Sequence, residues 1–353
     1  MKFLRLAFYV LIAQLVLSGC AGEAVEETSS SSSSEINFDA YLGRNASPRA
    51  GVTGIDSLKK SGFGVFARYK HNGATSLLMD NEHVTWNEKE NRWGYTNTRY
   101  WPNEGSVDFY AFAPYLKNVE LVNAPDSIKA NPTCIEFTSS ISPVDLVWDV
   151  QKNKTVPTSP TDGKVKFQFK HALARLGFDI TANQKLEENG AVIQVEEVKL
   201  YGDTIVNGAF DIKGYLNLEN GGWSRPKENT RVVYTWTPTG AEDGTNFKLS
   251  ASQLDHTCSK IENAPNSYLC IIPQEKWQKF YLQITYTVQQ GTFKEEVKVR
   301  KNLLDVRKQP GVSNPSFPFE KGKAYVFHLK LSLDPINFYV TTTVVDWKEG
   351  KNE

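Results

Sequence analysis

Residues 107–115 read VDFYAFAPY, the clearest strand pattern in the chain. Successive side chains of a β-strand point to opposite faces of its sheet, so each face shows every second residue. Apolar side chains occupy both faces here, with Val107, Phe109, Ala111 and Ala113 on one and Tyr110 and Phe112 on the other. A strand that is apolar on both faces is covered on both sides, so we expect it near the middle of a sheet.

Similar short runs recur along the chain, separated by turn residues, and no segment keeps a helical period. Aromatic residues make up 12% of the 353 residues, a composition that favours strands. Regularly spaced short strands predict antiparallel β-sandwiches in an all-β protein. The predicted strands cover residues 36–42, 63–67, 107–115, 134–137, 144–148, 165–169, 192–201, 210–218, 231–236, 267–272, 280–288, 293–300, 324–333 and 336–345.

Residues 155–163 are rich in Pro and small polar residues and interrupt this pattern. Such residues resist regular structure, so we expect a linker there. It separates a predicted N-terminal β-sandwich domain, residues 36–164, from a C-terminal one, residues 165–353. Lys plus Arg and Asp plus Glu number 40 each, and this balance gives no basic surface for nucleic acid.

The N-terminus, residues 1–19, reads as a lipoprotein signal peptide. Lys2 and Arg5 precede an apolar run over residues 6–17, which is shorter than the ~20 residues that span a bilayer. Leu-Ser-Gly then leads into Cys20, which resembles the lipobox of bacterial lipoproteins. The resemblance implies that Cys20 is acylated and holds the protein on outer-membrane lipid. An ordinary signal peptide with an incidental cysteine is the alternative.

Residues 20–35 are predicted to be a disordered tether. Glu23, Glu26 and Glu27 precede an unbroken serine run over residues 29–34, and such polar sequence cannot bury enough surface to order itself. The acidic residues after Cys20 resemble the export signal of Bacteroidia lipoproteins, which implies a lipid-anchored protein on the cell surface. A plain soluble spacer is the other interpretation.

The remaining cysteines are Cys134, Cys258 and Cys270. Cys258 and Cys270 are close enough in sequence to form a disulfide across a loop, although three separate thiols fit the sequence equally well. The five histidines show no metal-ligand spacing, and no nucleophile arrangement or phosphate-binding loop occurs. We therefore predict no catalytic residue, no metal, no cofactor and no enzymatic activity.

Several short pieces, in order along nearly the whole mature chain, match one family. They are residues 47–50 (SPRA), 62–67 (GFGVFA), 100–102 (YWP), 108–114 (DFYAFAP), 144–147 (VDLV), 169–175 (FKHALAR), 271–274 (IIPQ), 321–325 (KGKAY) and 345–347 (VDW). The chain resembles the fimbrillins, the Mfa-like and FimA-like subunits and accessory proteins of type V pili in Bacteroidia. This resemblance implies two tandem transthyretin-like β-sandwich domains with Greek-key connections, and a role in cell adhesion rather than catalysis.

The resemblance also implies that pilus subunits join by strand exchange. An arginine-specific protease would cut at Arg49, or at Arg44 as second choice, and release the first strand. A strand of the next subunit would then take its place by β-augmentation. An uncut strand that stays in its sandwich is the alternative. The removable strand has one apolar face: Ile36, Phe38, Ala40 and Leu42.

Only six residues, 348–353, follow Trp347, and most of them are charged. A shaft subunit should end in an apolar, alternating donor strand, and residues 336–345 read instead as a core strand. We therefore expect an anchor, tip or accessory subunit whose surface ligand is unknown. A pilus-independent lipoprotein that binds glycans through the aromatic residues 93–101 is the alternative function, although such clusters are more often core.

Three tripeptides resemble the O-glycosylation acceptor of periplasmic Bacteroidia proteins. Each contains Asp, then Ser or Thr, then an apolar residue, and the acceptors would be Ser57, Ser127 and Thr204. The pattern is short, so chance matches are expected. We hypothesise that at least one of the three is modified.

Overall fold

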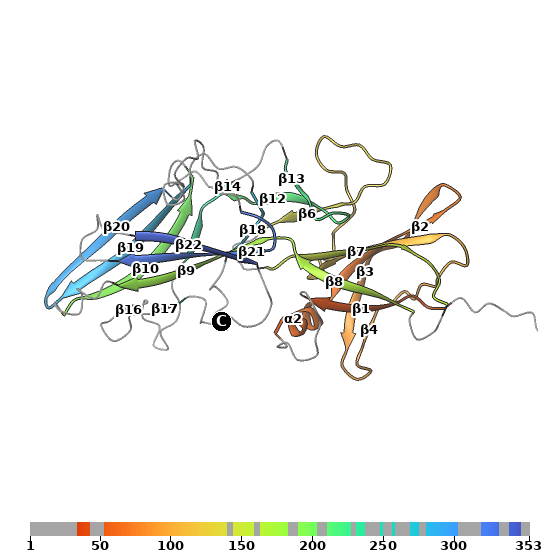
Figure 1. The fold of residues 1–353 in the computed structure, drawn as a ribbon, viewed down its shortest axis with the longest axis horizontal. Helices are drawn as coiled ribbons and strands as arrows, with labels where there is room; N and C mark the ends of the chain where they lie inside the picture. Colours follow the sequence, from red (N-terminus) through yellow and green to blue (C-terminus); the bar gives the residue numbers. More distant parts are fainter. Residues whose placement is uncertain are drawn as a thin grey trace, which may run out of the picture. The chain divides into compact units, whose positions relative to one another are not determined.

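The computed structural model describes most of the chain after residue 33 (Figure 1). Its described part consists of strands and one helix, which confirms the predicted all-β class. No helix in this part is long and apolar enough to cross a membrane. The described residues are 34–42, 53–139, 144–158, 163–182, 190–202, 210–226, 231–236, 248–249, 256–257, 269–274, 280–302, 319–331 and 339–346.

The N-terminal strands form a seven-stranded sheet in the order β1-β8-β7-β5-β2-β3-β4. Strand β5 lies in its middle, between β2 and β7, as its two apolar faces predict. Phe109 packs into one apolar cluster and Phe112 into another on the opposite face. The strands are β1 (Asn37–Leu42), β2 (Phe63–His71), β3 (Ala74–Asn87), β4 (Arg92–Gly94), β5 (Ser106–Ala113), β7 (Val147–Lys154) and β8 (Lys164–His171).

Helix α2 (Thr53–Ser61) is an element that the sequence did not predict. It lies beside β1 and β3, with Leu58 buried and Ile55 packed against the same apolar cluster as β1. The helix has only nine residues, so too few turns repeat for a helical period to show in the sequence. Its stability comes from packing on the sheet rather than from its own length.

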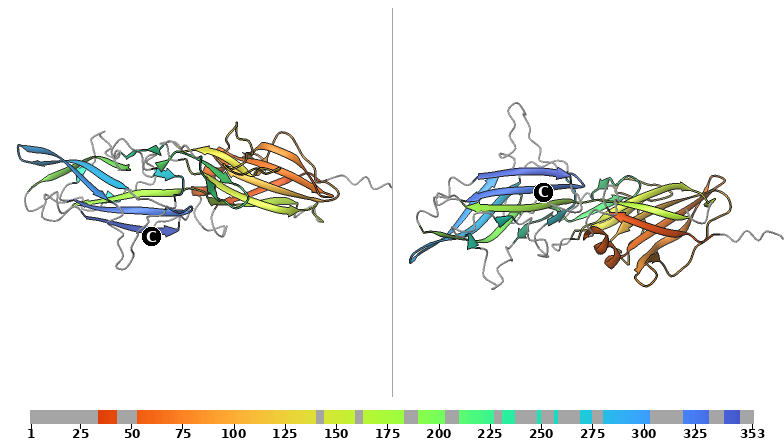
Figure 2. Two further views of the ribbon diagram at one scale, coloured as in Figure 1. Left: turned by 90° about the horizontal axis from the view of Figure 1, so that it is seen from above. Right: turned by 60° about the horizontal axis from the view of Figure 1, so that its bottom comes forward.

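Two five-stranded sheets make up most of the C-terminal part, and they lie face to face as two layers (Figure 2). One apolar cluster fills the space between them and includes Val195 and Ile284 of one sheet with Leu176 and Phe327 of the other. The first sheet contains β10 (Val192–Tyr201), β15 (Tyr234–Trp236), β16 (Lys248–Leu249), β19 (Tyr281–Gln290) and β20 (Phe293–Asn302). The second contains β9 (Ala174–Ala182), β17 (His256–Thr257), β18 (Leu269–Ile271), β21 (Lys323–Leu331) and β22 (Tyr339–Asp346).

Two small sheets complete the described part. One joins β6 (Cys134–Thr138), β12 (Lys213–Asn217) and β13 (Trp223–Ser224), and the other pairs β11 (Phe210–Asp211) with β14 (Arg231–Val232). Strand β6 comes before the predicted linker and β12 after it, so hydrogen bonds join the two parts of the chain.

Strand pairing differs from the sequence-based expectation in two respects. Strands β1 and β8 run parallel, as do β9 and β21, in sheets that are otherwise antiparallel. Strand β8 also belongs to the N-terminal sheet, although it follows the predicted boundary at residue 164. Alternation shows that residues 165–169 form a strand but not which sheet they join. The boundary stays a prediction, and the pairing favours one after His171.

Candidate functional site

Strand β1 lies at one edge of the seven-stranded sheet, where β8 is its hydrogen-bonded neighbour among the described strands (Figure 1). Phe38 lies opposite Val165, and Ala40 lies opposite Phe167. An edge strand pairs one row of its backbone groups with a neighbour and directs the other row away. Loss of β1 would therefore leave the edge of β8 as a template for a different strand.

The inner face of β1 fills an aromatic groove. Ile36, Phe38 and Ala40 are 0%, 2% and 2% exposed, as the alternation of the sequence predicts. Leu42, the fourth predicted residue of this face, is only partly buried against the same cluster. Four aromatic rings surround Phe38 at centroid distances of 5.4 to 6.3 Å: those of Phe63, Tyr95, Phe109 and Phe167.

The start of β1 is also held from its other side, by residues 95–101. The backbone N–H of Ile36 donates to the Arg99 carbonyl at 2.8 Å, and that of Trp101 donates to the Ser34 carbonyl at 3.0 Å. The Tyr95 hydroxyl donates to the Ile36 carbonyl at 2.7 Å, and burial raises the pKa of this tyrosine. Sequence reasoning missed these contacts, because backbone partners leave no residue pattern.

The outer face of β1 makes mainly local contacts. The Tyr41 hydroxyl donates to Asp39 Oδ2 at 2.7 Å, which raises the pKa of Tyr41. The other carboxylate oxygen of Asp39 accepts from the Ala40 backbone N–H at 3.0 Å. These contacts lie within the strand, so they would leave with it.

The predicted cleavage sites Arg44 and Arg49 lie outside the described residues, as does Cys20. The two arginines fall between Leu42, the last residue of β1, and Thr53, the first residue of α2. Leu58 holds α2 against the core from the far side of this segment. A cut at either arginine would therefore separate β1 from the chain that follows and leave α2 anchored.

The aromatic residues 93–101 do not form a glycan platform. Trp93 and Trp101 are each 4% exposed and belong to the apolar core beside β1. Trp101 packs edge-on against Phe109 with ring centroids 5.6 Å apart. Tyr100 is 50% exposed, but a single ring offers little surface for stacking a sugar. The alternative of a glycan-binding surface on these tryptophans is therefore wrong.

The predicted glycosylation acceptors lie in different settings. Ser57 is exposed on α2, but the next residue, Leu58, is buried in the core. Ser127 lies in a loop whose ends are joined by the Asn123 side chain, which accepts from the Lys129 N–H at 3.0 Å, and Ile128 beside it is 100% exposed. Thr204 lies outside the described residues.

Cys134 and Cys270 are free, buried thiols in the structure. Cys270 packs into an apolar cluster with Ile272 and Leu173, and burial raises its pKa well above the ordinary value. The disulfide considered between Cys258 and Cys270 is therefore not formed here, because the Cys270 thiol faces this core. Cys258 itself lies outside the described residues.

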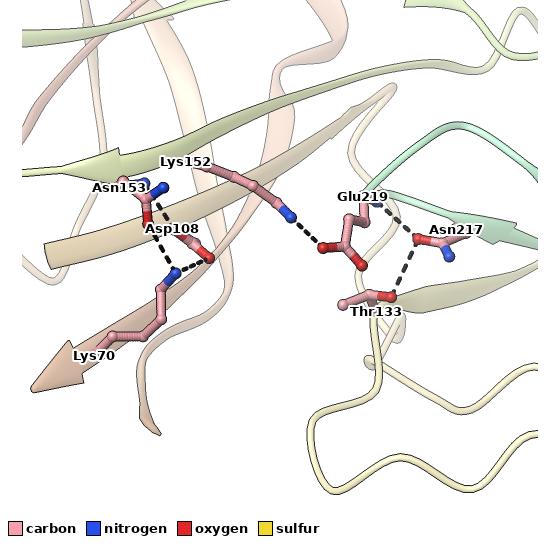
Figure 3. A network of polar contacts seen from close by, with 7 residues as sticks. All are labelled: Lys70, Asp108, Thr133, Lys152, Asn153, Asn217 and Glu219. Atoms are coloured by element: carbon pink, nitrogen blue, oxygen red, sulfur yellow. Dashed lines mark hydrogen bonds and ion pairs between the residues drawn. The ribbon is translucent and has the colours of Figure 1, made fainter. Parts of the chain in front are cut away.

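A polar network that sequence analysis missed links strands β2, β5 and β7 (Figure 3). Lys70 Nζ lies 2.7 Å from Asp108 Oδ2 and donates to Asn153 Oδ1 at 3.0 Å. The Asn153 backbone N–H donates to Asp108 Oδ1 at 2.8 Å. Asp108 stands in an apolar strand, and a charged residue in such a place indicates a buried pair.

The network continues from β7 to the turn after β12 (Figure 3). Lys152 forms an ion pair with Glu219, whose backbone N–H donates to Asn217 Oδ1 at 2.8 Å. The Thr133 hydroxyl donates to the same oxygen at 3.1 Å. These polar groups bind one another, so we interpret them as a network that stabilises the fold rather than a binding site. Among the described residues, no group of three or more His, Cys, Asp or Glu side chains could hold a metal ion.

A family model and a curated relative both relate this chain to fimbrial proteins. A family model described as fimbrillin-like matches residues 49–347. The fimbrium subunit Fim1C of Phocaeicola vulgatus is 23% identical over 379 aligned residues, which cover 97% of this chain and 96% of that protein. The family is one of fimbrial structural and adhesion proteins and is not enzymatic, which confirms the prediction of no enzymatic activity.

Solved structures share the fold. A fimbrial protein of Bacteroides vulgatus has a TM-score of 0.60 at 21% identity, covering 89% of this chain and 99% of that chain. A cell adhesion candidate from Bacteroides uniformis has a TM-score of 0.52 at 16% identity, covering 89% of this chain and 99% of that one. Because the family model spans most of the sequence, from residue 49 to residue 347, the chain belongs to the fimbrillin-like family.

Proposed function

We propose that this chain is an outer-membrane surface lipoprotein and an anchor, tip or accessory subunit of a type V pilus. Its family supports a fimbrial role in cell adhesion at the cell surface. The finer parts of the proposal are acylation at Cys20 and assembly by strand exchange with other pilus subunits. The lipobox-like sequence before Cys20 supports the first part, and strand β1 supports the second.

Strand β1 has the properties of a replaceable strand. It is an edge strand with one apolar face in an aromatic groove, and its outer face makes mainly local contacts. An extended peptide that adds to a sheet edge gains affinity from backbone hydrogen bonds and specificity from alternate side chains in pockets. The groove of β1 offers both, with an aromatic pocket for Phe38 and little room beside Ala40.

The C-terminal strand supports an accessory rather than a shaft role. Strand β22 is hydrogen-bonded to β21 along its whole length, from Tyr339 opposite Lys330 to Asp346 opposite Lys323. A strand committed to its own sheet is not a free donor. To donate β22, the chain would first have to break this pairing.

The sequence also contains a second copy of the start of β1. Residues 336–338 repeat the Ile-Asn-Phe of residues 36–38, and Val340 follows at the position equivalent to Ala40. A peptide with this pattern would place an aromatic ring in the pocket of Phe38. Valine is larger than alanine, and Ala40 is 2% exposed, so this copy should fit less well than the native strand.

Peptide exchange tests the proposal. The chain is nicked with an arginine-specific protease and mixed with a fluorescent peptide of residues 36–42, and binding is followed by anisotropy. We expect the nicked chain to exchange β1 for the peptide and the intact chain not to bind it. A peptide with Phe38→Ala should bind more than about 100-fold more weakly, since its aromatic pocket stays empty.

The matched control is the chain with Arg44→Ala and Arg49→Ala, which should stay uncut in this segment and bind no peptide. Equal binding to intact and nicked chains would contradict strand exchange. Retention of β1 by the nicked chain at all peptide concentrations would contradict it as well. The N-terminal residue of the surface protein tests anchoring separately: acylated Cys20 indicates a retained lipid, and Ala50 indicates a processed subunit.

A further inference from the structure

Strand β20 has a charge pattern that reverses about its centre. Residues 295–301 read EEVKVRK, so two acids and two bases flank the symmetrical Val-Lys-Val at the middle. The ten-residue strand ends its sheet, and β19 is its hydrogen-bonded neighbour among the described strands (Figure 1). An edge of this length is a template for pairing with another strand.

We propose that a second copy of this chain pairs with β20 through its own β20, antiparallel and centred on Lys298. The two sheets then continue into each other about a two-fold axis, on which Lys298 faces the partner's Lys298, and each contact away from the axis occurs twice. In this register Glu295 faces the partner's Lys301 and Glu296 faces the partner's Arg300. Val297 faces the partner's Val299.

The geometry of the β19–β20 hairpin decides which backbone N–H and C=O groups of β20 point away from β19 and could pair with a second copy. Gln290 lies opposite Phe293 across a two-residue turn, and Gly291 has φ of 58°. In such a hairpin the flanking residues exchange both hydrogen bonds, and paired residues recur at every second position. The odd-numbered residues of β20 therefore bond to β19, and the even-numbered ones face outward. A two-fold axis at Lys298 pairs even-numbered residues with even-numbered residues, so the ladder closes.

The side chains suit this contact. Val297 and Val299 are half-buried against the core cluster, and the partner's valines would remove more of their apolar surface from water. Arg300 lies 3.8 Å from the centre of the Tyr281 ring, which holds its guanidinium on the outer face of the sheet. Glu296 already pairs with Lys298 at 2.7 Å, so in the dimer it lies between Lys298 and the partner's Arg300.

Other registers bring more like charges together than the one centred on Lys298. Parallel in-register pairing sets Glu295 against the partner's Glu295, and a two-fold axis at Val297 sets Lys294 against the partner's Arg300. Like charges directly opposite destabilise a strand pair. The register centred on Lys298 also sets Lys298 against the partner's Lys298 on the axis, but this one like-charged contact stands against four unlike-charged pairs, more than either other arrangement offers.

Sedimentation velocity tests the dimer. The protein is residues 20–353 with Cys20→Ala, so that no acyl group drives association, and residues 34–353 form a compact unit of their own. We expect a dimer that dissociates on dilution and weakens with salt. Glu295→Lys with Glu296→Lys should raise the dissociation constant more than about tenfold, since four attractive cross-strand pairs become repulsive. The control variant Glu88→Lys with Glu120→Lys, at two exposed positions, should leave the dissociation constant unchanged.

Charge exchange separates a specific pairing from a general charge effect. The variant Arg300→Glu with Lys301→Glu should also be monomeric, and its equimolar mixture with the Glu295→Lys, Glu296→Lys variant should form a heterodimer. Circular dichroism and thermal melting check that each variant is folded. A monomeric wild-type chain, a dimer that survives either charge reversal, or a mixture that stays monomeric would overturn the proposal.

Discussion

The ring of Phe38 stacks on the ring of Phe167, with centroids 5.8 Å apart and 23° between their planes. Phe38 belongs to the first strand of the chain and Phe167 to the last strand of the same sheet. The contact therefore joins the edge strand β1 to its neighbour β8, which lies far from it in the sequence. Offset aromatic pairs of this kind stabilise a fold beyond the area that they bury.

Substitution of Phe38 tests how much this contact contributes. Phe38→Ala should lower the free energy of unfolding by about 3–5 kcal/mol, because it leaves a cavity among four aromatic rings. Urea denaturation measures the loss. Asn37→Ala, on the partly exposed face of the same strand, should change stability by less than about 0.5 kcal/mol. Similar losses for the two variants would show that the groove collapses around the missing ring.

Gly221 and Gly190 form a matched pair. Both have positive φ, of 67° and 62°, but a Cβ on Gly221 would lie 2.0 Å from the Trp148 ring, while one on Gly190 would meet nothing within 4 Å. Gly190→Ala should lower the free energy of unfolding by about 1 kcal/mol, because alanine is strained in the left-handed backbone conformation. Gly221→Ala should lower the free energy of unfolding by about 1–3 kcal/mol more than Gly190→Ala does, because its Cβ would also clash with the Trp148 ring. Equal losses in thermal or urea unfolding would contradict the close packing at Trp148.

Alkaline stability should depend on Tyr110. Burial, with help from the charges of Asp108 and Glu219, raises the pKa of Tyr110 to about 12. An unfolded tyrosine titrates near pH 10, so between about pH 10 and 12 the folded chain keeps a proton that the unfolded chain loses. Stability is therefore full below about pH 10 and falls as pH rises through this range.

The variant Tyr110→Phe has no such proton to lose. Its stability should fall less steeply than that of the wild type between about pH 10 and 12, as measured by urea midpoints at several pH values. Exposed Tyr100→Phe serves as the control and should follow the wild type. An unchanged slope in Tyr110→Phe would show that other groups cause the alkaline loss.

Glycosylation should favour Ser127 over Ser57. Ile128 is fully exposed and can enter an enzyme's binding site, whereas Leu58 is 3% exposed and would have to leave the core. Intact-mass measurement of protein from the native cell envelope should therefore show added hexose that Ser127→Ala removes and Ser57→Ala does not. A native mass without any added sugar would exclude both acceptors.

Local patterns predicted several of the strands but missed β3 (Ala74–Asn87), β4 and β9. Alternation located β1, the core of β2, and β5 with both faces buried, because side-chain direction depends only on the local backbone. Residues 144–146 were expected to begin a strand, but β7 starts at Val147. Ends of elements depend on where hydrogen-bonded partners stop, which a single segment does not encode.

Pairing across the sequence was not predictable in the same way. The parallel neighbours of β1 and β9, and the membership of β8 in the first sheet, follow from contacts between distant segments. The network around Asp108 and the backbone contacts of Tyr95 and Arg99 are also non-local. The lone charge of Asp108 in an apolar strand was the available signal, and it did not identify Lys70 as the partner.

The parallel pairing of β1 with β8 also sets an order of events. A polypeptide made from its N-terminus presents β1 first, and β8 follows only after the intervening strands. Contacts of such high sequence separation form slowly, because the loop between them must close first. The edge pairing of β1 therefore has to wait for β8, although β1 precedes it in the chain. During that interval the aromatic side chains that surround Phe38 lack the ring that covers them in the folded chain.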